Sequence, residues 1–495
     1  MANYLRKAIK GVSYVFILSV SSIVLSYFFR LLVARNLSAA QFGLFHAVMA
    51  FTVLLHALHD PGLKSALIKF VPEFLVRGEQ KKINDAIKVT LAVWMGLSAL
   101  FSLGTILFAD QLAIHYFKDA QSSVVLILLA IAFLLQSVDY IVAYLFQGFQ
   151  RMGLFAGVDF SRSAVLLIAV GVGFTFSKSP AVPAVAYIVS SVMLSVIYWP
   201  ILKRKVFPEL SWPKGWDGKL LKKMAVFGIP VTLSALAYTV FQQMSALALT
   251  YFGTLEEVGL LSVALLTAGL LISFSSSIAF VIFPLASELN AQGYHEHIKE
   301  GIQLVYRFAV IAILPISLGL LGFAGLIVKL LFGAQYTAAA PALMLLAIGT
   351  LFWIIAGINF NLLAGMSYSR EPMKVMILIT VVSAILNVLL IPLFGLTGAA
   401  LAIVIGYLLA MVLSIIVVRR HVQIQIPVWA WSKNMLAGLV FLAVIYIAQN
   451  LPMANQYVKA ALGLAIAGAI YAALVVILKV TSWKEVTQYL SRMRA

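Results

Sequence analysis

The chain has 495 residues, of which 63% are hydrophobic and 11% charged, whereas a soluble protein carries about a quarter charged residues. It has no cysteine, which excludes disulfides, thiolate nucleophiles and cysteine-ligated metals. The formal charge of +18 is scattered among short loops, which argues against a nucleic-acid-binding face.

Long apolar runs recur from one end of the sequence to the other, and each is long enough to cross a bilayer. They predict an all-α polytopic membrane protein with fourteen transmembrane helices and no soluble domain. The first run is too long for a signal peptide and is interpreted as a retained span. The predicted spans are centred near residues 22, 50, 98, 133, 167, 191, 237, 270, 314, 350, 383, 407, 440 and 468.

The basic residues lie mainly in the loops on one side of the predicted membrane. The densest group falls in the connection at residues 203–224. Lysine and arginine accumulate in cytoplasmic loops, so both termini are predicted to be cytoplasmic in a multi-pass protein of the cell membrane. With this orientation the outer loops hold four basic residues: Lys118, Lys178, Lys329 and Lys459.

The sequence nearly repeats itself at a spacing of 215 to 217 residues. "QFGLFHAVMA" (41–50) resembles "EVGLLSVALL" (257–266), and "PEFLVRGEQKKINDAI" (72–87) resembles "SELNAQGYHEHIKEGI" (287–302). An even number of spans per repeat implies halves of parallel topology, an architecture found in transporters.

Two capping-box patterns occupy matching positions in the repeats. Ser38 with Gln41, and Thr254 with Glu257, are each predicted to start the second span of their half. The repeat therefore predicts two pseudo-symmetric six-helix lobes plus two C-terminal helices. The expected boundaries are 1–215 for the first lobe, 216–430 for the second, and 431–495 for the last two helices and a cytoplasmic tail.

Signatures of catalysis are missing from the sequence. There is no GxxxxGK[ST] phosphate loop and no HExxH motif, and the seven histidines are dispersed. A transporter that is not an enzyme, with no metal and no cofactor, is therefore expected.

Polar residues at predicted membrane depth are the candidates for a substrate site, because such residues are costly there. Arg30 and Arg35 end the first span, and the alternative for each is an anchor at the outer boundary. Asp60 and Lys64 flank the helix-breaking pair Pro61–Gly62, and their alternative is a simple turn at the inner boundary.

Asp139 is expected to be buried in the fourth span, where a carboxylate needs a partner, water, a bound cation or a proton. Asp159 and Arg162 are predicted to form a surface pair at a helix start. The second half offers mainly neutral polar candidates, with Gln242 in the seventh span and Asn359 in the tenth.

Several passages resemble the multidrug/oligosaccharidyl-lipid/polysaccharide exporter superfamily, and within it the polysaccharide-type flippases. They are the "R-x-L…F-G-L-F" passage across spans 1 and 2, "DPGLKSALIKFVPEFLVRGEQKKI" (60–83), "FPLASELNAQG" (283–293) and "LAGMSYSREPM" (363–373). The resemblance implies a two-lobed transporter that works by alternating access. Its cargo would be an oligosaccharide on a polyprenyl phosphate or diphosphate, turned from the inner to the outer leaflet.

The resemblance also bears on the cargo. Arg30 matches in type an arginine that the lipid II flippase branch carries on its first span, but the paired arginines of that branch after span 2 are replaced here by residues 60–64. A polysaccharide repeat or a glycoprotein glycan is thus favoured over a peptidoglycan precursor. The drug-exporting branch relies on an acidic residue in span 1 or 7, and neither span has one.

The leading hypothesis is a lipid-linked oligosaccharide flippase whose diphosphate binds Arg30, with Lys64 as a second charge. Its expected partners are this substrate, membrane lipid and the glycosyltransferases or polymerase of a polysaccharide pathway. Coupling to H⁺ or Na⁺ through Asp139 is left open. The alternatives are a cation-coupled exporter of drugs or small amphiphiles, which would need Asp139 rather than Arg30, and a membrane scaffold that transports nothing.

Overall fold

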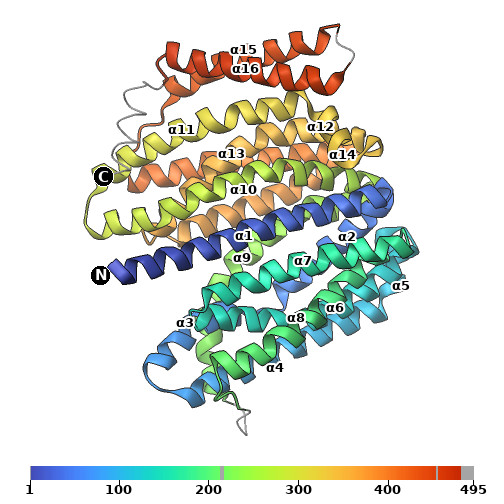
Figure 1. Ribbon diagram of the computed structural model, residues 1–495, viewed down its shortest axis with the longest axis vertical. Coiled ribbons are helices and arrows are strands. Elements are labelled where there is room, and N and C mark those ends of the chain that lie inside the picture. The colour runs from blue at the N-terminus through green and yellow to red at the C-terminus, as the bar shows by residue number, and fades with distance from the viewer. Residues whose placement is uncertain (1, 212–216, 453–454, 481–495) are drawn as a thin grey trace. The chain divides into compact units, whose positions relative to one another are not determined.

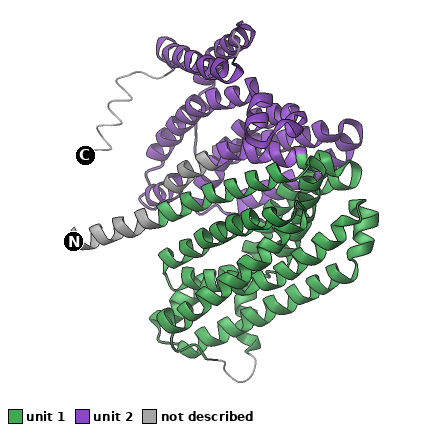
Figure 2. Cartoon of the chain, turned by 45° about the vertical axis from the view of Figure 1, so that its right-hand side comes forward, with its two compact units in different colours: residues 1–259 green, residues 260–495 purple. Residues whose placement is uncertain are grey.

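The computed structural model describes residues 2–211, 217–452 and 455–480, and every regular element in these ranges is a helix (Figure 1). The described chain divides into two compact units, residues 1–259 and 260–495, which are coloured separately in Figure 2. The expectation of an all-α polytopic protein is confirmed. The lobe boundaries predicted from the repeat remain a prediction.

The first unit contains most of the polar residues singled out in the sequence. Its long helices are α1 (Ala2–Asn36), α2 (Ala39–Leu58), α3 (Leu63–Val76), α4 (Gln80–Leu107), α6 (Gln121–Gly148), α7 (Met152–Phe176), α8 (Ala181–Ile201) and α9 (Gly218–Phe252). Its short helices are α5 (Ala109–Leu112), η1 (Ala113–Phe117) and η2 (Leu202–Val206).

The second unit begins within a helix that starts in the first. Its elements are α10 (Leu255–Ala291), α11 (His295–Gly322), α12 (Ala324–Phe332), η3 (Ala334–Ala339), α13 (Ala340–Gly365), α14 (Arg370–His421), α15 (Val428–Asn450) and α16 (Gln456–Ile477).

The described residues contain 13 helical segments that are long and apolar enough to cross a membrane. One of them, α14, has 52 residues and a non-helical backbone at Gly395, where φ is 53°. A straight helix of that length would measure about 78 Å, more than twice the thickness of a bilayer's hydrocarbon core of about 30 Å. Helix α14 therefore has the length of two crossings joined at Gly395, which agrees with the predicted total of fourteen.

Both predicted capping boxes are present. The Ser38 N–H donates to Gln41 Oε1 and the Gln41 N–H to Ser38 Oγ, each at 3.2 Å. The Thr254 N–H donates to Glu257 Oε2 at 3.0 Å and the Glu257 N–H to Thr254 Oγ1 at 3.2 Å. These reciprocal bonds satisfy the N–H groups that a helix start leaves without partners, so α2 and α10 begin where the sequence predicts.

The two helices that follow these caps differ in one respect. The helix after the first cap, α2, ends at Leu58, and a new helix, α3, begins at Leu63. Gly62, between them, has a φ of 90°, a value that glycine adopts without strain. Helix α10, in contrast, continues without interruption from Leu255 to Ala291. The break after α2 is the local feature that shapes the candidate site.

Helix α2 makes close backbone contacts through glycine near both of its ends. A Cβ atom on Gly43 would overlap the carbonyl oxygen of Leu255 and lie 2.7 Å from the backbone nitrogen of Gly259. A Cβ atom on Gly62 would overlap the backbone of Gly228 in α9. These positions need glycine because backbone occupies the space of a side chain.

We predict that Gly43→Ala lowers the stability of the protein by about 1–3 kcal/mol, because the methyl group forces two helix backbones apart. The measurement is thermal unfolding of the purified protein in detergent. Gly96→Ala is the matched control, since no described atom lies within 4 Å of a Cβ there and alanine favours a helix by up to about 1 kcal/mol. Equal stability of the two variants would contradict the assignment of a close contact at Gly43.

Candidate functional site

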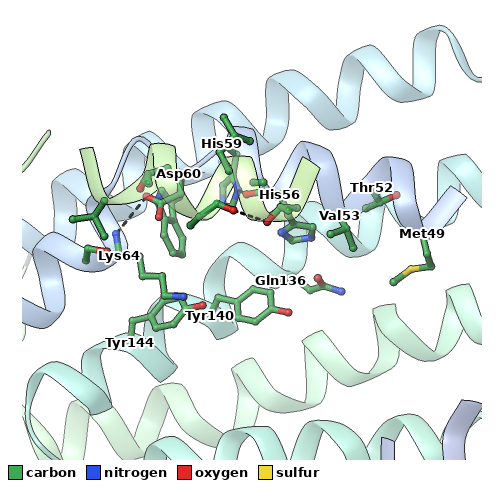
Figure 3. Close-up of a pocket in the computed structure, with 18 of the residues that line it drawn as sticks. Met49, Thr52, Val53, His56, His59, Asp60, Lys64, Gln136, Tyr140 and Tyr144 are labelled. Atoms are coloured by element: carbon green, nitrogen blue, oxygen red, sulfur yellow. Dashed lines mark hydrogen bonds between the residues drawn. The ribbon is translucent and has the colours of Figure 1, made fainter. Parts of the chain in front are cut away.

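A cavity of about 670 Å³ lies within the first unit (Figure 3). It is bordered mainly by α2, α6 and α9, with two side chains from α3 and single side chains from α4 and α8. Its polar lining residues that matter below are His56, Asp60, Lys64, Trp94, Gln136, Tyr140 and Tyr144. Polar groups gathered in a cavity of a membrane-spanning unit indicate a binding site, because they are costly where nothing wets or pairs with them.

Asp60 holds the start of α3. Its Oδ1 atom accepts hydrogen bonds from the backbone N–H groups of Gly62 (3.0 Å), Leu63 (2.7 Å) and Lys64 (3.3 Å). The indole Nε1–H of Trp94 donates to the same oxygen at 3.2 Å. The carboxylate thus serves as the cap that a helix N-terminus requires, and all four of these bonds are made to its Oδ1 atom.

Lys64 follows one turn later and reaches the cavity wall. Its Nζ atom lies 4.5 Å from the centroid of the Tyr144 ring, a cation–π contact. Lys64 forms no ion pair within the described part of the chain. It is therefore a partly buried cation on the wall whose charge no carboxylate neutralises at contact distance.

Helix α6 supplies a polar stripe on the opposite wall. Gln136, Tyr140 and Tyr144 are spaced four residues apart and all line the cavity, because residues at this spacing share one helix face. None of these three residues was among the site residues predicted from the sequence. The spacing of the three residues was the signal that could have found them.

Asp139 is buried as expected, and of the alternatives left open by the sequence the structure gives it a charged partner. Arg162 of α7 approaches it, with Nη2 3.3 Å from Asp139 Oδ2, and the two side chains are 13% and 2% exposed. The predicted surface pair of Asp159 with Arg162 is wrong, because α7 turns Arg162 toward α6, where burial makes a compensating charge necessary. Neither Asp139 nor Arg162 is among the residues that line the cavity.

The structure gathers two of the seven predicted site residues, Asp60 and Lys64, at this cavity. Arg30 and Arg35 have exposed side chains on α1 and are not among its lining residues. Gln242 of α9 donates to the hydroxyl of Tyr238 at 2.9 Å.

Asn359 lies in the second unit, in a closed hydrogen-bond network. Its Oδ1 accepts from the Tyr306 hydroxyl, and its Nδ2 donates to Ser414 Oγ at 2.9 Å. This network links α11, α13 and α14 and satisfies a fully buried amide. No three His, Asp or Glu side chains among the described residues are arranged to hold a metal ion.

An all-helical chain with many spans and a polar cavity in its membrane-spanning part has the fold of a membrane transporter. The structure is similar to a lipid II flippase, MurJ, in an inward closed conformation, with a TM-score of 0.76 at 14% sequence identity over 93% of this chain and 98% of that one. It is also similar to an inward-facing multidrug resistance MATE family transporter, with a TM-score of 0.66 at 15% identity over 81% and 94% of the two chains.

The chain belongs to the polysaccharide biosynthesis protein family, which matches residues 8–290. It is 27% identical to an uncharacterised membrane protein of Methanocaldococcus jannaschii over 91% of each chain. It is 23% identical to the probable low-salt glycan biosynthesis flippase Agl15 of Haloferax volcanii over 87% of this chain and 88% of that protein. The protein is therefore a multi-pass membrane protein of a flippase and transporter family, and not an enzyme.

We predict that Asp60→Ala destabilises the protein by about 1–2 kcal/mol, because α3 loses its cap and the Trp94 indole loses its acceptor. Asp60→Asn keeps an acceptor oxygen at the same place, so its effect is expected to be less than half as large. Thermal unfolding in detergent measures both. If the two variants were equally destabilised, the negative charge rather than the cap would be the important property of Asp60.

Proposed function

We propose that the protein is a flippase that moves a polyprenyl-(di)phosphate-linked oligosaccharide from the cytoplasmic to the outer leaflet by alternating access, for assembly of a cell-surface polysaccharide or glycan. The family and the Agl15 relative support this class of cargo. The fold shared with MurJ supports the mechanism.

The observation that carries the proposal is the cation on the cavity wall. A phosphate or diphosphate group needs positive partners in a confined cavity, where the attraction between opposite charges is stronger than in water. The Asp60 carboxylate is already bonded to the start of α3 and to Trp94, so it competes little for Lys64. Lys64 is therefore available to a phosphate, and the polyprenyl tail would remain in lipid.

The sequence led us to expect Arg30 as the main phosphate ligand, and its role in the present proposal is different. Its exposed position on α1 puts it outside the lining of the cavity. We retain it as a second phosphate contact that would act in another conformation of the transport cycle. The ion pair of Asp139 with Arg162 makes Asp139 a less suitable site for a coupling H⁺ or Na⁺, because a positive charge already occupies its surroundings.

We further propose that both termini are cytoplasmic and that the enzymes which make and use the lipid-linked oligosaccharide are the functional partners. Glycosyltransferases would supply the cargo on the inner leaflet, and a polymerase or glycan transferase would remove it on the outer leaflet. Removal of the product would drive net transport in one direction.

We predict that Lys64→Gln lowers the rate of flipping by about tenfold, the loss expected when one charge-assisted contact of about 1.4 kcal/mol is removed. The measurement is reconstitution into liposomes with a fluorescent polyprenyl-diphosphate oligosaccharide, followed by the outward exposure of its headgroup. Arg30→Ala is measured beside it.

The matched control is Lys69→Gln, which removes the same charge from the same helix at an exposed position that is not among the lining residues. Flipping at the native rate by Lys64→Gln would remove the main support for this phosphate site. Transport of a soluble organic cation, with no flipping of the lipid by the native chain, would favour the exporter alternative.

The orientation can be tested because the chain has no cysteine. A single cysteine at Lys178, in the connection between α7 and α8, is expected to react with a membrane-impermeant maleimide on intact cells. A single cysteine at Lys81, at the start of α4, is expected to react only after the cells are permeabilised. The reverse pattern would invert the orientation inferred from the basic loops.

A further inference from the structure

Two tyrosine rings form a continuous surface on the α6 wall of the cavity. The rings of Tyr140 and Tyr144 have centroids 6.2 Å apart and planes that differ by 13°. Because the two residues are one helical turn apart, the rings lie side by side instead of covering each other. Flat aromatic surface of this kind is suited to sugar rings, whose C–H groups carry small positive partial charges and pack on the negative face of an aromatic ring.

The Tyr140 ring is held by a buried guanidinium. The Cζ atom of Arg162 lies 4.0 Å from the centroid of this ring, and Asp139 neutralises the arginine at 3.3 Å. The ring lines the cavity, whereas the ion pair does not. A charged pair is expensive to bury, so its place behind a cavity-lining ring calls for an explanation beyond stability. A cation–π contact at this distance restrains the orientation of the ring.

The polar and aromatic groups along the cavity, Lys64 from α3 and three residues from α6, follow an order that matches a lipid-linked sugar. Figure 3 shows Lys64, Tyr144, Tyr140 and Gln136 in succession along the cavity. The series therefore runs from a cation, through two aromatic rings, to an amide with hydrogen-bonding capacity. A lipid-linked oligosaccharide presents its phosphate first and its sugar rings next, with hydroxyl groups at their edges.

We propose that Tyr144 and Tyr140 form a subsite for the pyranose rings next to the phosphate, and that the Asp139–Arg162 pair is a positioning device that fixes the Tyr140 ring for this contact. This inference rests on the proposed flippase function and specifies how the same cavity recognises its cargo. Gln136 and His56, which lie beside Tyr140 on the cavity wall, would bond the sugar hydroxyls. Asp139 then acts on the sugar through Arg162 and Tyr140, without binding a coupling ion.

The test compares two lipids in proteoliposomes of the full chain. One is a fluorescent polyprenyl diphosphate that bears a pyranose disaccharide, and the other is the same lipid diphosphate without sugar. The ratio of their flipping rates reports sugar recognition separately from phosphate recognition. We expect the native chain to flip the sugar-bearing lipid faster. Equal rates would overturn the subsite but not the flippase, whereas flipping of neither lipid would overturn both.

Tyr140→Leu is expected to lower this ratio by about five- to tenfold, which corresponds to the loss of one stacking contact. Tyr140→Phe keeps the aromatic face and is expected to keep the ratio within about twofold, because the hydroxyl adds little to stacking. Tyr251→Leu, a change of the same type at an exposed residue that is not among the lining residues, is the control. An unchanged ratio in Tyr140→Leu would overturn the proposal, whether both rates stay native or both fall by the same factor.

The positioning role is tested at Arg162. Arg162→Lys keeps the charge but loses the planar stack, so it is expected to lower the ratio by about two- to fivefold with little effect on the bare lipid. Because loss of one partner of a buried pair can unfold a protein, the double variant Asp139→Leu/Arg162→Leu, which leaves no buried charge, is the second test and is expected to lose the same selectivity.

Two results would contradict the positioning role of the Asp139–Arg162 pair. If transport by the native chain depends on an H⁺ or Na⁺ gradient, and Asp139→Asn remains folded but slows both lipids equally and removes this dependence, Asp139 is the coupling residue and the positioning role is wrong. If the ratio of the two flipping rates is the same as in the native chain for both Arg162→Lys and the double variant Asp139→Leu/Arg162→Leu, the positioning role is also wrong.

Discussion

The candidate site depends on the bonds that the Asp60 carboxylate makes to the first turn of α3. Without such an acceptor, the N–H groups at the start of a helix lack a partner within the protein. With it, the second span can stop at Leu58 and a new helix can begin at Leu63. This break places Lys64 on the cavity wall, where no carboxylate of the described residues forms an ion pair with it. Helix α10, which starts with the same type of cap, continues unbroken.

Charge in the first unit is managed by local compensation. Asp60 accepts hydrogen bonds from backbone and indole donors, and Asp139 forms an ion pair with Arg162. The second unit instead buries neutral groups such as Asn359, whose amide is bonded on both sides. Burying an ion costs free energy, so buried charged groups are expected where a binding site needs them and neutral polar groups elsewhere. A charged cargo would therefore be recognised mainly by the first unit.

The cavity combines two kinds of recognition that differ in range. A cation attracts a phosphate over several ångströms with little demand on geometry, whereas stacking requires a ring at a defined place and angle. Lys64 would therefore select for the charged lipid, while Tyr140 and Tyr144 would select among the groups attached to it. The cation–π contact of Arg162 with Tyr140 would serve the second task, because a ring without a defined orientation could not discriminate.

The sequence by itself determined the membrane-spanning class and the starts of α2 and α10. Apolar length and capping residues are local signals, and the bilayer makes them decisive. It also pointed to Asp60, Lys64 and a buried Asp139. Only the tertiary structure decided which helix faces meet, and so it decided that Arg162 serves Asp139 and that Tyr140 and Tyr144 line the cavity with Lys64. It also placed Arg30 outside that cavity. The rotation of one helix against another depends on contacts between residues far apart in the chain, and a pattern within a single helix does not contain that information.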